Sequence, residues 1–242
     1  MNTKIVRYIL CRMLGVEAAL LLVPVLVAVI YQEKCGIVFL IPIVILCLLF
    51  LVAGRKRPEH GQIYGKEGMV IVALAWILWS LFGAMPFTLS GYIPSYVDAF
   101  FETVSGFTTT GSSIIPDVEV LPHCLLFWRS FTHWIGGMGV LVFVLVVTSL
   151  DRKNSMHLMR AEVPGPEKDK LVPKAMSTAR ILYGMYLILT VIEMVFLVIG
   201  GMNLFDSMIF SFGSAGTGGF SNYADSVAHF NSAYIDGVIT VF

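Results

Sequence analysis

Long apolar runs constrain this sequence more than any other feature. A membrane-spanning helix needs about 20 predominantly apolar residues. Runs close to that length occupy residues 14–31, 37–53, 69–89, 125–150 and 178–200, and a shorter run occupies residues 233–242. Hydrophobic residues make up 57% of the 242, only 13% are charged, and the mean hydropathy is +0.83. A soluble domain of this size needs more polar surface, so the sequence predicts an all-α integral membrane protein.

A short polar segment lies between two of these runs. Residues 97–107 have the pattern of a half-length helix, and residues 108–113 follow as a turn of threonine, glycine and serine, within FFETVSGFTTTGSSI. Non-helical backbone at membrane depth must be buried in protein or line a wet cavity. Carbonyls of such loops replace the hydration shell of an ion in cation filters. The segment is therefore either a re-entrant helix with a carbonyl-lined loop or an ordinary extracellular loop with a threonine-rich turn.

The same segment recurs 108 positions later. With that shift Asp98 falls on Asp206, Thr109 on Thr217 and Gly111 on Gly219. The second copy, LFDSMIFSFGSAGTGGFSNYAD, gives a half-helix at residues 204–215 and a loop at residues 216–221. Because this copy also lies between apolar runs, the repeat favours a pore built from duplicated helix–loop–helix units.

Charged residues are distributed unevenly along the chain. If the spans alternate, nearly all Lys and Arg lie on one side, in the N-terminal segment and in the polar loops 54–68 and 151–177. The regions 90–122 and 201–231 contain neither Lys nor Arg, but they carry Asp and Glu. The positive-inside rule then places the basic side and the N-terminus in the cytoplasm. The two loops open outward, into an acidic vestibule that concentrates cations.

Three stretches carry a resemblance to a known family: GFTTTGSS, FWRSFTHWIGGMGVLVF, and AEVPGPEKDKLVPKAMSTARILYGMY followed by SAGTGGFSN. On these motifs the chain resembles the N-terminal half of a Trk-type potassium-uptake subunit, from the Trk/Ktr/HKT cation transporter superfamily. The resemblance implies a potassium-channel-like fold of helix–pore-loop–helix repeats around one pore, preceded by two extra transmembrane helices. Four such repeats complete the pore in that family.

The resemblance also implies a division of the chain. Residues 1–53 form the two extra helices, 54–68 a cytoplasmic loop, 69–150 the first repeat, 151–177 a second cytoplasmic loop and 178–242 a second repeat that stops within its last helix. Two filter loops do not close a four-sided site. A non-conducting half-subunit that needs a partner chain therefore remains an alternative to a potassium-uptake pore.

The loops supply the expected ion-binding residues. Glycine adopts a positive φ without a Cβ clash, which lets the backbone alternate in handedness so that successive carbonyls point the same way. In the family, glycine at the filter position favours potassium, and serine in the first repeat shifts the preference toward sodium. Both matching positions here are glycine, so potassium uptake is expected, with sodium or mixed monovalent cation transport as the alternative. By resemblance the selectivity filter that holds potassium comprises Thr108, Thr109, Thr110, Gly111, Gly216, Thr217, Gly218 and Gly219.

Two charged residues are candidates for the scaffold of the filter. Arg129 lies in the apolar run 125–150, where an arginine is costly unless it is paired or solvated. It either tethers the filter scaffold, with Glu102 as its partner, or extends to water from the membrane interface.

A smooth helix face that favours close packing is formed by Gly136, Gly137 and Gly139.

The expected partners follow from the resemblance and from charge. A cytoplasmic nucleotide-binding Trk regulatory subunit is expected to dock on Lys168, Lys170 and Lys174, unless these lysines only mark a solvated loop. The chain is expected to lie in the inner (plasma) membrane as a multi-pass protein and a homodimer. A net charge of zero gives no reason to expect nucleic acid. No cofactor is expected: potassium is the substrate, and nucleotide acts only through the partner.

An intramembrane hydrolase is the alternative from another functional class. It would use a serine such as Ser214 with a histidine such as His133. Phe212 stands where the GxSxG elbow of such enzymes has a glycine, and no Walker motif is present. The sequence therefore predicts a transport protein and not an enzyme.

Overall fold

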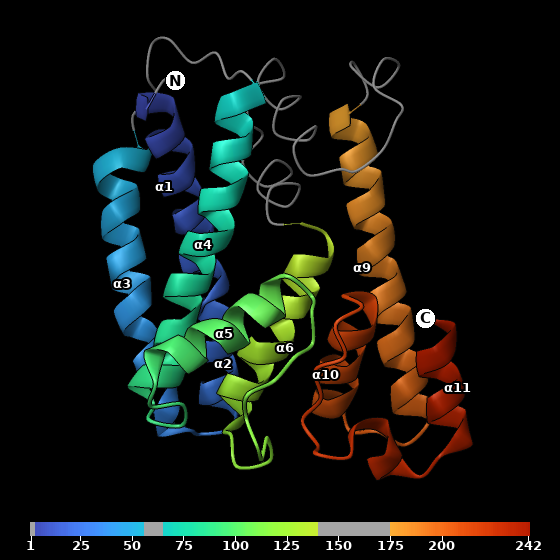
Figure 1. Cartoon of the computed structure of the whole chain (residues 1–242). Helices are drawn as coiled ribbons and strands as arrows, with labels where there is room; N and C mark the ends of the chain where they lie inside the picture. Colours follow the sequence, from blue (N-terminus) through green and yellow to red (C-terminus); the bar gives the residue numbers. More distant parts are fainter. Residues whose placement is uncertain (1–2, 56–64, 140–174) are drawn as a thin grey trace.

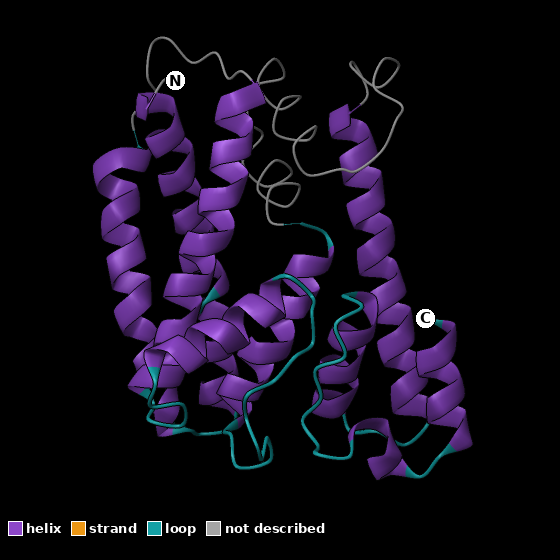
Figure 2. Cartoon of the chain, viewed as in Figure 1, coloured by secondary structure: helices purple, strands orange, loops and turns teal. Residues whose placement is uncertain are grey.

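The structure, a computed structural model, describes residues 3–55, 65–139 and 175–242. Every regular element within these residues is helical (Figure 2). In this part of the chain, stretches long and apolar enough to cross a membrane are Thr3–Ile30, Lys34–Gly54, Glu67–Leu89 and Ile181–Ile199. They overlap the runs predicted at 14–31, 37–53, 69–89 and 178–200. The predicted all-α membrane fold is confirmed.

The first span starts earlier than the apolar run suggested. Helix α1 covers Thr3–Leu20 and α2 covers Leu22–Ile30, whereas the sequence predicted a start at residue 14. The basic N-terminal residues are part of the helix, and the Arg12 guanidinium donates to the Tyr8 hydroxyl one turn earlier, at 3.0 Å. The break at Leu21 is explained by Pro24, which has no N–H to donate to the preceding turn.

A polar turn links this span to the next one and to the rest of the molecule. It leads into η1 (Lys34–Phe39), α3 (Leu40–Leu49) and the π-helical turn η2 (Phe50–Gly54). The Glu33 carboxylate in the turn accepts hydrogen bonds from the backbone N–H groups of His123 (2.7 Å) and Cys124 (3.0 Å). These residues begin α6, so Glu33 satisfies N–H groups that a helix N-terminus leaves unpaired.

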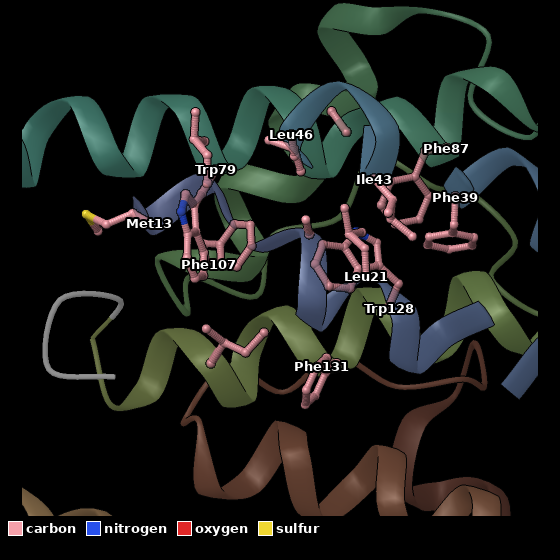
Figure 3. Close-up of a cluster of buried hydrophobic side chains, with 14 of the residues drawn as sticks. Met13, Leu21, Phe39, Ile43, Leu46, Trp79, Phe87, Phe107, Trp128 and Phe131 are labelled. Carbon is pink, nitrogen blue, oxygen red and sulfur yellow. The ribbon is translucent and has the colours of Figure 1, made fainter. Parts of the chain in front are cut away.

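The first repeat is built around one aromatic cluster. It comprises α4 (Gly65–Leu89), the short helix α5 (Tyr96–Phe107) and α6 (His123–Gly137). The Phe107 ring makes edge-to-face contacts with Trp79 and Trp128, with ring centroids 5.6 and 6.1 Å apart (Figure 3). Trp128 Nε1 donates to the Gly83 carbonyl at 2.9 Å, so the buried indole is satisfied and α6 is joined to α4.

The predicted fourth span is wrong in one respect. The sequence predicted one helix through residues 125–150, but α6 ends at Gly137, and Gly139 has φ +69°. A positive φ cannot continue a right-handed helix, which explains the end of α6. An apolar run gives no sign of such an interruption. Residues 140–150 lie outside the described residues.

The second repeat repeats this order. It comprises α9 (Ala175–Ile199), the short helix α10 (Leu204–Ala215), the turn η3 (Ser226–Phe230) and α11 (Ala233–Val241). In Figure 1 these elements, drawn in orange and red, form a group beside the elements α1 to α6, which are drawn in blue to yellow-green. The two groups meet where α10 packs against α6.

Candidate functional site

Two short helices end inside the protein and lead into matched loops. Helices α5 and α10 have 12 residues each and start 108 positions apart. Each begins with a capping side chain: Ser95 accepts from the Asp98 N–H, and Asn203 accepts from the Asp206 N–H. An acidic residue in the first turn suits the positive end of the helix dipole. The predicted half-helices 97–107 and 204–215 agree with these bounds to within one residue.

The loops that follow, residues 108–113 (the first loop) and 216–221 (the second loop), have the same backbone. In the first, Thr109 has φ +54° and Gly111 φ +75°; in the second, Thr217 has φ +58° and Gly219 φ +79°. Each loop thus has a left-handed residue, one outside that region, and another left-handed residue. This alternation is what brings successive carbonyls to one side of an extended strand.

The hydrogen bonds that close the two short helices also match. Thr109 N donates to Gly106 O at 3.0 Å, and Thr217 N donates to Ser214 O at 2.9 Å. Positive φ is rare for a β-branched residue and costs roughly 1–3 kcal/mol. Sequence reasoning expected positive φ only at glycine and missed both threonines. Their position two residues before a glycine, in both copies, was the available signal.

The predicted ion-binding residues of the two loops come together. A Cβ on Gly111 would collide with the carbonyl oxygen of Gly218, so the loops touch at a point that only glycine permits. The Thr108 hydroxyl donates to Val104 O at 2.7 Å and lies 2.8 Å from the Thr110 hydroxyl. These hydroxyls brace the first loop. In the second loop, no described atom lies within 4 Å of the position that a Cβ on Gly219 would take.

A buried ion pair between α5 and α6 holds the end of the first loop. Arg129 Nε donates to Glu102 Oε1 at 2.6 Å, and both side chains are at least 97% buried. The same carboxylate accepts from the Ser113 hydroxyl (3.0 Å) and from the Ile114 N–H (2.9 Å). The predicted neighbours are therefore in contact, and Arg129 does not extend to water.

Arg129 also reaches the second loop, which the sequence did not indicate. Its Nη1 donates to Ser221 O at 2.9 Å, and its guanidinium lies 3.6 Å from the centroid of the Phe220 ring. One side chain of α6 therefore joins the segments that end both loops. The two hydrogen-bonded residues are 92 positions apart, so only the fold brings them together.

Small residues let α6 approach both loops closely. A Cβ on Gly136 would collide with the Phe107 carbonyl oxygen, and one on Gly137 would lie 2.9 Å from Gly216 Cα. Close packing, which the sequence favoured for this glycine face, is what the structure shows at these two positions.

The second loop is followed by a polar network centred on Asp206. The Asp206 carboxylate is 3% exposed and accepts from the side chains of Asn203 (2.7 Å), Asn222 and Tyr223 (2.9 Å). Burial, together with the hydrogen bond to Asp206, raises the pKa of the Tyr223 hydroxyl to about 12. The tyrosine is therefore a hydrogen-bond donor at neutral pH.

Other predicted features are absent from this site or lie elsewhere. The ring Nδ1 of His133 faces the Phe220 N–H at 3.4 Å and not Ser214, which leaves the hydrolase alternative without its hydrogen bond. Lys168, Lys170 and Lys174 lie outside the described residues. Among the described residues no group of three or more His, Cys, Asp or Glu is placed to hold a metal ion.

A family described as "TrkH: Cation transport protein" matches residues 36–242. The chain belongs to this family. As a family of transport proteins, TrkH agrees with the prediction that the chain is not an enzyme.

Relatives of the TrkH family give the extent of the match. The Trk system potassium uptake protein TrkH of Escherichia coli K12 is 37% identical over 225 residues, covering 92% of this chain and 47% of that protein. The Trk system potassium uptake protein TrkG of the same strain is 35% identical over 248 residues, covering 100% of this chain and 51% of that protein. The crystal structure of the potassium transporter TrkH from Vibrio parahaemolyticus superposes with a TM-score of 0.83 at 31% identity, over 100% of this chain and 49% of that one. The chain thus spans about half the length of the relatives it matches, and it has the fold of an integral membrane transporter.

Proposed function

We propose that this chain forms the first two quadrants of a potassium-uptake pore, with its two matched loops lining the ion pathway as a selectivity filter. The observation that carries the proposal is the repeated alternation of left-handed residues at Thr109 and Gly111, and again at Thr217 and Gly219. A strained backbone that is kept in two copies, and held by buried charges, suits a function of the backbone itself.

Carbonyl oxygens and hydroxyls replace the hydration shell of a monovalent cation. In this proposal the residues in contact with potassium are Thr108, Thr109, Thr110, Gly111, Gly216, Thr217, Gly218 and Gly219. Relatives named as potassium uptake proteins support potassium as the ion. Glu102 and Arg129 serve as the filter scaffold, since both hold backbone groups at the ends of the loops through hydrogen bonds.

The driving force and the orientation follow from charge. Inward cation movement gains about 2.3 kcal/mol per charge per 100 mV of membrane potential, so no catalytic chemistry and no cofactor is needed. We place the N-terminus in the cytoplasm and the loops outside, in the inner membrane, because the regions 90–122 and 201–231 contain no Lys or Arg. The loop 151–177, with Lys168, Lys170 and Lys174, then faces a cytoplasmic nucleotide-binding regulatory subunit, and two copies of the whole protein form a homodimer.

The decisive substitution is Gly111→Ser in the complete protein. Serine adds a side chain where the Gly218 carbonyl leaves no room and disfavours φ +75°. We expect the potassium-over-sodium permeability ratio, from reversal potentials in proteoliposomes, to fall about tenfold, the factor equivalent to one well-placed ligand interaction.

Gly91→Ser is the matched control. Gly91 also has a positive φ (+79°) and free space around it, but it lies between α4 and α5, away from both loops. The Gly91→Ser variant introduces backbone strain without changing the ion pathway. We expect its potassium-over-sodium permeability ratio to stay at the wild-type value. An unchanged ratio in Gly111→Ser would show that the loops do not select the ion. A wild-type ratio near one would favour mixed cation transport, and no flux at all would favour a non-conducting half-subunit.

A further inference from the structure

His133 lies in α6, one helical turn after Arg129, and is fully buried. It belongs to the first repeat, yet its ring contacts the second loop. The imidazole ring stacks on Phe220, with centroids 3.9 Å apart and planes 17° apart. The Phe220 N–H points at Nδ1 at 3.4 Å. Because Nδ1 faces a donor, it acts as an acceptor, and a neutral ring carries its proton on Nε2.

Phe220 is held on both faces. The Arg129 guanidinium and the His133 ring each lie within 4 Å of the Phe220 centroid. Two groups at that distance cannot share one face of a ring, so they lie on opposite faces. Phe220 therefore inserts between two side chains that are four positions apart on α6. This fixes the end of the second loop both along α6 and across it.

His133 also determines how closely the second loop approaches α6. A Cβ on Gly218 would collide with the imidazole ring, and one on Gly216 would lie 2.6 Å from the His133 carbonyl oxygen. Gly218 is not in the left-handed region, and the three atoms nearest to the position of an added Cβ all belong to the His133 ring. The backbone of the second loop thus follows the surface of this histidine.

The carbonyl of Gly218 is the atom that contacts Gly111 of the first loop. A continuous path of contact therefore runs from the His133 ring through Gly218 to Gly111. Ion preference depends on where loop carbonyls lie, whether through cavity size or through the number and field of the ligands. A residue that sets the position of the Gly218 carbonyl therefore bears on ion preference without touching the ion.

We propose that His133 is a positioning residue for ion selectivity: it holds the second loop, a segment of the other repeat, at the depth at which the Gly218 carbonyl meets Gly111. This inference rests on the proposed function, since it assigns His133 a role in the same ion pathway. It predicts an effect on the preference between ions, whereas a merely structural role would alter only folding or total flux.

Two substitutions in the complete protein distinguish the effect of ring stacking on Phe220 from the effect of the hydrogen-bond acceptor Nδ1. His133→Phe keeps a planar ring that can stack on Phe220 but removes the acceptor for its N–H. His133→Asn places an acceptor oxygen near the position of Nδ1 without the ring. Reversal potentials in proteoliposomes should show that His133→Phe loses about tenfold in potassium-over-sodium permeability, the factor equivalent to one hydrogen bond. His133→Asn should recover most of that loss.

A wild-type permeability ratio in His133→Phe would overturn the inference and leave the proposed function intact. Failure of the wild-type protein to conduct potassium would instead overturn the proposed function. Gly218→Ala provides a second test if His133→Phe does not fold. The added methyl group collides with the ring in the wild-type background but has room in His133→Ala.

We expect the loss of permeability ratio caused by Gly218→Ala to be at least about fivefold smaller in the His133→Ala background, because contacting residues couple. The control is Gly219→Ala, whose Cβ would meet no described atom within 4 Å and whose effect should be equal in both backgrounds. Equal effects of Gly218→Ala in the two backgrounds would also overturn the inference.

Discussion

The first and second loops have one backbone conformation but are held in different ways. The segment that ends the first loop is held by Glu102, which belongs to the same repeat as that loop. The second loop is held largely by α6 of the first repeat, through Arg129 and His133. At the positions 108 residues after Glu102 and Arg129 the sequence has Phe210 and Gly237, so the buried ion pair has no copy. The second repeat shares the loop backbone of the first repeat but not the residues that hold it in place.

This difference has a consequence for how the two repeats depend on each other. Removing a support from the second repeat should affect one loop, whereas removing Arg129 or its partner should affect both.

The largest effect is expected for Glu102→Gln. The substitution removes the charge that compensates Arg129, and leaving one member of a buried pair uncompensated costs about 3 kcal/mol. The free energy of unfolding should fall by that amount, and both loops should loosen, since Arg129 contacts Glu102 and Ser221 O.

Protection of the backbone amides in residues 108–115 and 216–222 against hydrogen exchange would show this. Loss of protection confined to the first loop would contradict the view that one ion pair serves both repeats. Glu119→Gln is the control, because this exposed carboxylate accepts only the Ala224 N–H, at 3.2 Å, among its described hydrogen bonds. It should change stability by less than about 1 kcal/mol.

An intermediate effect is expected when the matched aspartates are compared. Asp206 accepts from three side chains while nearly fully buried, whereas the described contact of Asp98 is a cap in which its own N–H is the donor. Asp206→Asn should destabilise the protein by about 2 kcal/mol, since hydrogen bonds to a charged group contribute more than neutral ones. Asp98→Asn should cost only about 0.5 kcal/mol through the helix dipole. Thermal unfolding of both variants measures the difference, and equal shifts in midpoint would refute it.

The smallest effect concerns Glu33, which supports α6 from outside both repeats. Burial alone would raise the pKa of the Glu33 carboxyl, but hydrogen bonds from Cys124 and His123 lower it by more, to below its ordinary value of 4.5. The stabilisation by Glu33 is therefore complete above pH 4.5 and is lost as the pH falls through the folded-state pKa.

Glu33→Gln tests this linkage. The variant should be less stable than the wild type at pH 7, by about 1 kcal/mol, and the difference should shrink as the pH is lowered from 5 toward 3. Unfolding free energies at a series of pH values give the comparison. A difference that stays constant over this range would mean that the Glu33 charge does not stabilise the start of α6.

The sequence predicted the elements that depend on local pattern. The half-helices were predicted at the right places because the acidic residues of their first turns, Asp98 and Asp206, recur at one spacing. The end of α6 at Gly137 was missed because hydropathy does not register a change in backbone handedness. The positive φ of Thr109 and Thr217 was missed because a β-branched side chain argues against it.

Contacts between the two repeats could not be predicted from sequence at all. Arg129 was a candidate because a charge in an apolar run needs a partner, and Glu102 was the partner proposed for it. Its second partner, Ser221, and the pairing of His133 with Phe220 join residues 92 and 87 positions apart. No periodicity encodes such pairs. The division of the chain into residues 1–53, 69–150 and 178–242 remains a prediction.

The most direct test of the central claim is to locate a heavy cation in the complete protein. Crystals soaked in rubidium or thallium, which substitute for potassium, would give an anomalous signal at each bound ion. The account predicts a signal within coordination distance of loop carbonyls, where Gly111 meets Gly218. A protein that transports potassium but binds the heavy cation only away from residues 108–111 and 216–219 would contradict it.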